Sequence, residues 1–121
     1  MFQAQQLTAK AATSTPSVYS PWVNRMGDNM LYSVDLVDKS GSALQLKVTV
    51  LTKNTEDLPS AQTTLTNITT TGSGSEVVTE EQAGGIKEQV RYKFELAGTI
   101  AAGDWVLFRM LQPIWYDSVT A

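Results

Sequence analysis

Residues 86–96, Ile-Lys-Glu-Gln-Val-Arg-Tyr-Lys-Phe-Glu-Leu, carry the clearest pattern in this chain and decide its fold class. Apolar side chains from Ile86 to Leu96 fall on alternate positions, with Glu88 among them, and the positions between hold only polar or charged side chains such as Arg91 and Lys93. A β-strand that buries one face has this period of two. The stretch therefore predicts a strand with one face on a hydrophobic core.

The same alternation occurs in residues 30–38 and 43–52. Between these two runs lies Asp38-Lys-Ser-Gly-Ser42, a short polar segment in which Gly41 tolerates a positive φ. Two alternating runs joined by such a turn are typical of a β-hairpin. We predict a hairpin over residues 30–52.

Residues 105–112 are apolar on both faces except at Arg109. A strand of this kind is usually central and covered on both sides. An arginine in such a strand needs a carboxylate partner when it is buried. The sequence offers Asp104 or Glu95 as that partner, or else Arg109 emerges at an interface.

Thr-rich residues 63–71 and the short run 76–81 add further strands, separated by breakers such as Gly72-Ser-Gly74. About six to eight strands at this spacing predict an all-β fold, an antiparallel β-sandwich of the jelly-roll or Ig-like type, with a barrel as the other topology. Pro16 and Pro21 favour an extended path before the strands. We expect residues 1–21 to form an extended N-terminal arm and residues 22–121 to form a single domain.

The composition excludes several functional classes. The 121 residues include no Cys and no His, which removes thiol catalysis, imidazole acid–base chemistry and His- or Cys-bound zinc. The net charge is −3 with no run of Lys or Arg, so we expect no nucleic-acid partner. No apolar stretch is long enough for a membrane span, and residues 1–10 do not have the pattern of a signal peptide. We expect a protein that is not an enzyme, with no catalytic residue, no cofactor, no metal and no membrane partner.

Two kinds of side chain remain as candidates for a binding site. Carboxylates in or beside loops could ligate calcium, but their spacing matches no EF-hand, and solvated loop carboxylates are the favoured interpretation; they are Asp28, Asp35, Asp38, Glu56 and Asp57. Aromatic rings could stack on sugars, although large aromatics near apolar strands usually fill cores or interfaces; they are Trp105, Trp115 and Tyr116. Trp22 follows the proline-bounded stretch and anchors it either to its own core or to a neighbouring molecule.

Two phrases carry a resemblance to a known group of proteins. Met26-Gly-Asp-Asn-Met-Leu-Tyr32 and Ala102-Gly-Asp-Trp-Val-Leu-Phe-Arg109 resemble strand entries of small β-sandwich proteins associated with the virion shells of tailed phages. The resemblance implies a capsid-associated or decoration protein that acts through many weak contacts. It also implies a location in the virion, after assembly in the host cytoplasm.

We therefore expect a structural protein that contacts further copies of itself, a larger protein shell, or both. The expected interface residues are Phe2, Leu7, Tyr19, Trp22, Arg109, Trp115 and Tyr116. The alternative is a carbohydrate-binding β-sandwich module that uses Trp115, Tyr116 or Trp22.

Overall fold

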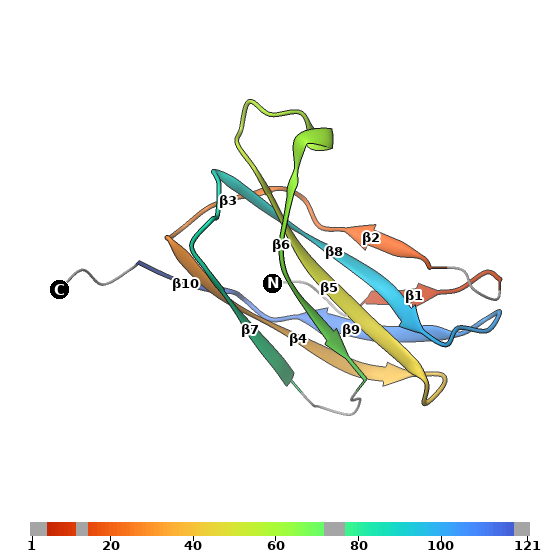
Figure 1. Cartoon of the computed structure of the whole chain (residues 1–121). Helices are drawn as coiled ribbons and strands as arrows, with labels where there is room; N and C mark the ends of the chain where they lie inside the picture. The colour runs from red at the N-terminus through yellow and green to blue at the C-terminus, as the bar shows by residue number, and fades with distance from the viewer. Residues whose placement is uncertain (1–4, 12–14, 72–76, 118–121) are drawn as a thin grey trace.

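A computed structural model describes residues 5–11, 15–71 and 77–117, and it shows two antiparallel β-sheets packed face to face (Figure 1). In sheet A the spatial order is β1, β9, β4 and β7, and β10 pairs with the start of β4 on the edge that β9 occupies further along. The strands of sheet A are β1 (Gln5–Thr8), β4 (Asn29–Lys39), β7 (Val77–Ala83), β9 (Trp105–Met110) and β10 (Ile114–Tyr116).

In sheet B the spatial order is β2, β8, β5 and β6, and β3 continues the edge that β2 begins. Its strands are β2 (Ser17–Tyr19), β3 (Val23–Asn24), β5 (Leu44–Lys53), β6 (Thr63–Thr70) and β8 (Gln89–Gly98). The loop from β5 to β6 contains a short 3₁₀ helix, η1 (Pro59–Ala61), and projects beyond the sheets in Figure 1.

The strand order is that of a jelly roll. With β2 and β3 taken as one strand and β9 and β10 as another, the chain alternates between the two sheets at every connection except β5 to β6. This alternation produces two interleaved four-stranded sheets, the arrangement of double-sheet jelly rolls. The prediction of an all-β antiparallel sandwich is confirmed. Of the jelly-roll and Ig-like types that were predicted for it, the strand order matches the jelly roll.

The inward faces of the two sheets form one core. Met30, Tyr32 and Val34 of β4 are fully buried against the inward residues of β5 and β8. Aromatic rings join the layers: the ring centroids of Phe94 and Phe108 lie 4.8 Å apart, with the two ring planes tilted by 31°. The alternation read from the sequence is the direct cause, since it places every second side chain in this core.

The predicted hairpin over residues 30–52 is wrong. β4 lies in sheet A and β5 in sheet B, so residues 40–43 carry the chain across the sandwich instead of turning it back in one sheet. A register shift between Leu36 and Asp38 disturbs the end of β4. Beyond it, the Lys39 ammonium group donates to the carbonyls of Ser42, Leu44 and Thr71 and holds the crossing in place.

The stretch expected as an arm is largely built into the sandwich over its described residues. β1 pairs with β9, and Leu7 and Ala9 are buried in the core. β2 pairs with β8, and Pro16 accepts a hydrogen bond from the backbone of Leu96. Open edges of β8 and β9 explain this placement, because an unpaired strand edge leaves backbone donors and acceptors unsatisfied.

Candidate functional site

The outer face of sheet A is more apolar than a solvent-facing sheet needs to be. We call it the sheet A face and define it by residues that point away from the core. They are Leu31, Asp35, Val77, Trp105, Leu107, Arg109 and Ile114. The polar side chains of Gln6, Thr8, Ser33, Thr79 and Glu81 lie on the same side of the sheet. β9 is central, as predicted, but the cover expected on its second side is incomplete, since Trp105 and Leu107 are only half-buried. Ile114 is 62% exposed.

An ion pair lies in the middle of the sheet A face. Arg109 Nε donates to Asp35 Oδ2 at 3.0 Å, where β9 and β4 place the two residues directly opposite each other. The Asp35 side chain is only 5% exposed, whereas that of Arg109 is 52% exposed. Arg109 therefore has an internal carboxylate partner, which was one of the two predicted outcomes. The partner is Asp35, however, and not Asp104 or Glu95. The half-exposed position of Arg109 also leaves it available for contact with another molecule.

A second group of side chains lies on the outer face of sheet B. We call it the sheet B cluster: Tyr19, Trp22, Lys53, Arg91 and Lys93. The Arg91 guanidinium carbon lies 4.2 Å from the centroid of the Tyr19 ring and 4.7 Å from that of Trp22. The Lys53 ammonium nitrogen lies 5.1 Å from the centroid of the Trp22 ring, and that of Lys93 lies 5.8 Å from the centroid of the Tyr19 ring. These distances fall within the range of cation–π attraction.

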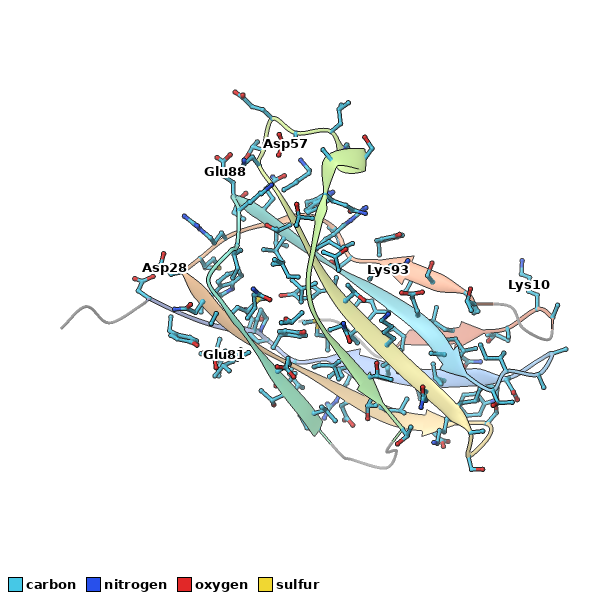
Figure 2. The ribbon with its side chains drawn as sticks, in the orientation of Figure 1. Lys10, Asp28, Asp57, Glu81, Glu88 and Lys93 are labelled. Atoms are coloured by element: carbon cyan, nitrogen blue, oxygen red, sulfur yellow. The ribbon has the colours of Figure 1, made fainter. Side chains whose placement is uncertain are left out.

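Lys53 links the sheet B cluster to the loop before β6. Its ammonium group is buried and donates to the carbonyls of Asn54, Thr55 and Asp57. Asp57 and Glu88 close the loop by accepting hydrogen bonds from the backbone of Asn54 and Thr55, and Figure 2 shows both carboxylates at this end of the molecule. The loop is thus held by charged side chains and not by a hydrophobic core.

The remaining predicted interface residues divide between the core and the surface. Leu7 is buried in the core, and Trp115 is half-buried and packs against it. Tyr116 is half-buried, and its hydroxyl hydrogen-bonds the carboxylate of Glu81, which raises the pKa of that hydroxyl. Tyr19 is 42% exposed, and Trp22 is half-buried under Arg91 and Lys53. Phe2 lies outside the described residues.

The carboxylates considered for calcium do not gather at one place in the described part of the chain. Asp35 pairs with Arg109, Asp57 accepts the Asn54 amide, and Asp38 accepts the amide of Lys39. Across residues 5–11, 15–71 and 77–117, no group of three His, Cys, Asp or Glu side chains is placed to hold a metal ion.

Charge is divided unevenly between the two sheets. Six of the nine Lys and Arg residues lie in strands of sheet B or within two residues of one: Arg25, Lys47, Lys53, Lys87, Arg91 and Lys93. Among the described Asp and Glu residues, seven lie in strands of sheet A or directly beside one: Asp28, Asp35, Asp38, Glu80, Glu81, Asp104 and Asp117. Figure 2 labels Lys93 beside β8 and Glu81 beside β7. The sheet B layer is therefore the more cationic one, in a chain whose net charge is −3.

Sequence reasoning missed most of both surfaces. Tyr19 and Trp22 are far from Arg91 in the sequence, and they meet it only because β2 pairs with β8. The signal for the sheet A face was present, since Leu107 and Ile114 occupy positions where a strand with one wet face would carry polar residues. The same apolar pattern also fits a strand that is covered on both sides, which is what the sequence predicts for residues 105–112.

Comparisons with protein-family models, with curated proteins and with solved structures gave no match to this chain. In the described residues no helix is long and apolar enough to cross a membrane. The two surfaces themselves are therefore the basis for any functional proposal.

Proposed function

We propose that this chain is a non-enzymatic structural protein that packs against other protein surfaces, as a subunit or decoration of a larger shell such as a virion. The sheet A face is the contact surface in this proposal. Its partner is a second copy of this chain or the shell itself.

The observation that carries the proposal is the apolar character of the sheet A face. Trp105 and Leu107 lie at one end of the face, and Leu31 and Ile114 are paired at the other. Aromatic residues and arginine are enriched at protein–protein interfaces, and Arg109 supplies the polar centre of this one. Burial of these side chains against a partner would be favourable, because removing apolar surface from water contributes about 25 cal/mol of free energy per Å².

The jelly roll is compatible with this proposal but does not decide it. Viral capsid domains and lectins both use double-sheet jelly rolls, so the fold supports an assembly protein and a carbohydrate-binding module alike. The arrangement of the aromatic residues favours the assembly protein. Trp115 packs against the core, and the rings of Tyr19 and Trp22 have cations over them. Neither arrangement offers the open pair of rings on which a neutral sugar would stack.

The decisive experiment compares two substitutions of exposed apolar residues. Ile114→Lys places a charge on the sheet A face, where the native side chain is 62% exposed and contributes little to folding. Leu58→Lys is the control, since Leu58 is 72% exposed but lies in the loop before β6. We expect the purified native chain to form oligomers in sedimentation velocity or to co-purify with a large particle. Ile114→Lys should abolish this association and Leu58→Lys should retain it.

Two results would contradict the proposal. One is a native chain that stays monomeric at high concentration and purifies from its native extract without a particle. The other is association that survives Ile114→Lys and a second charge at Leu107→Lys, while thermal unfolding shows that both variants are folded.

A further inference from the structure

The charge of Arg91 has no carboxylate to balance it in the described part of the chain. Its Nε and Nη2 atoms both donate to Gln62 Oε1, at 3.2 and 2.7 Å, and its two remaining neighbours are the rings of Tyr19 and Trp22. The ion pairs found among the described residues are Lys93–Glu95 and Arg109–Asp35. Arginine is rarely fully buried without a charged partner, and the half-buried Arg91 keeps part of its surface open to solvent.

This imbalance is local to sheet B. The chain holds more acids than bases, yet Arg91 and Lys53 both lie over the Trp22 ring without an acidic side chain within ion-pair distance among the described residues. Packing of residues 19–22 onto β8 accounts for the rings, because they cover the stems of the cations. It does not account for the unbalanced positive charge, which creates a local potential that attracts an anion.

We infer that the sheet B cluster is a binding site for an acidic saccharide, a compact sugar that carries a carboxylate or a sulfate group. Arg91 is the anion-binding residue. Because its Nε and Nη2 atoms donate to Gln62, the Nη1 side of the guanidinium is the part that would donate to a carboxylate or sulfate oxygen. The Tyr19 ring, which is 42% exposed, supplies an apolar surface for the sugar beside it. The inference rests on a different surface from that of the proposed function and does not depend on it.

Other anionic partners fit the sheet B cluster less well. A nucleic acid needs a row of cations along its backbone, whereas this chain has a net charge of −3 and Lys93 is already paired with Glu95. An acidic peptide that adds as a strand needs a long open edge. β2 has three residues, and Pro16 and Pro21 lie at its two ends. A single acidic sugar requires neither.

The test is a titration of the full chain, labelled with ¹⁵N, with four probes in low salt. The probes are a hyaluronan tetrasaccharide, N-acetylglucosamine 6-sulfate, neutral chitotetraose and oligothymidylate. We expect saturable shifts of backbone amides in β2 and β8 with one or both acidic sugars, and none with chitotetraose. Arg91→Met should weaken binding by about tenfold or more, since it removes the positive charge and any charge-assisted hydrogen bond that the guanidinium donates to the ligand.

Matched variants separate the site from the general charge of the protein. Lys10→Met removes one positive charge at the exposed end that Figure 2 labels and should leave the affinity unchanged. If Arg91→Met does not fold, Arg91→Lys and Tyr19→Leu take its place, and each should weaken binding. The inference is overturned by absence of saturable shifts with both acidic sugars, by equal binding of chitotetraose, by tighter binding of oligothymidylate, or by an affinity that none of these cluster variants lowers.

Discussion

The two outer faces of this sandwich differ far more than its two inner faces do. Inward, both sheets present aliphatic and aromatic side chains that are nearly interchangeable in kind. Outward, sheet A carries half-buried apolar residues around the Asp35–Arg109 pair, and sheet B carries cations held over aromatic rings. The inner faces therefore form the shared core, whereas the outer faces differ in the charged and apolar side chains that they carry.

This comparison assumes that both faces rest on one shared core, and Phe108→Ala tests that assumption with the largest expected effect. Phe108 is fully buried in sheet A, and its ring lies against that of Phe94 in sheet B. We expect a loss of about 3–5 kcal/mol in the free energy of unfolding, from lost burial and the cavity left behind. Urea unfolding followed by far-UV circular dichroism and by tryptophan fluorescence should give one coincident transition.

The exposed Ile114 provides the control for that experiment. Ile114→Ala removes an apolar side chain from the sheet A face and should change stability by less than about 0.5 kcal/mol. Separate transitions by the two probes, or a similar loss for both variants, would mean that the faces do not share one cooperative core.

The polar centres of the two faces should respond differently to loss of an arginine. Arg109→Met leaves the Asp35 carboxylate buried without its partner, so we expect a loss of about 2–3 kcal/mol, below the range for fully buried pairs because Arg109 is half exposed. Arg91→Met leaves only a neutral amide and two rings behind, and we expect about 1 kcal/mol. Chemical denaturation of both variants measures the difference.

Asp35→Asn separates charge from packing in the same experiment. It leaves Arg109 able to turn into solvent and keeps a hydrogen-bond acceptor in place, so it should cost about 1 kcal/mol. A ranking in which Arg91→Met is the most damaging of the three variants would reverse the contrast between the faces.

The strands were predictable from sequence, but their partners were not. Alternation in residues 30–38, 43–52 and 86–96 reflects burial of one face, and each of these stretches coincides with much of a strand. Alternation says nothing about which neighbour a strand pairs with. The short turn after Lys39 suits a hairpin and a crossing between sheets equally, and the deciding contacts to Leu44 and Thr71 form only in the fold.

The surfaces were less predictable for the same reason. From the sequence, Asp35 is a candidate calcium ligand, and the candidate partners of Arg109 are Asp104 and Glu95. The Asp35–Arg109 pair is not predictable, because only the pairing of β4 with β9 places these two residues opposite each other. The sequence predicts that Trp22 anchors the segment around it, but it does not predict the contact with Arg91. Arg91 is far away in the sequence and lies over the Trp22 ring only in the folded sheet B. Long-range pairing thus created both surfaces from residues that looked unrelated.

The smallest predicted effect concerns the contact between Tyr19 and Arg91. A double-mutant cycle of Tyr19→Leu and Arg91→Met isolates it from the burial of each side chain. We expect a coupling energy of about 0.5–1 kcal/mol, the value for a cation–π pair near solvent, measured by urea unfolding at low salt. A parallel cycle of Tyr19→Leu and Arg109→Met should give no coupling, because Arg109 lies on the opposite face. Equal coupling in both cycles would show that Tyr19 acts through the shared core, and the cation–π contact would then not be a property of sheet B alone.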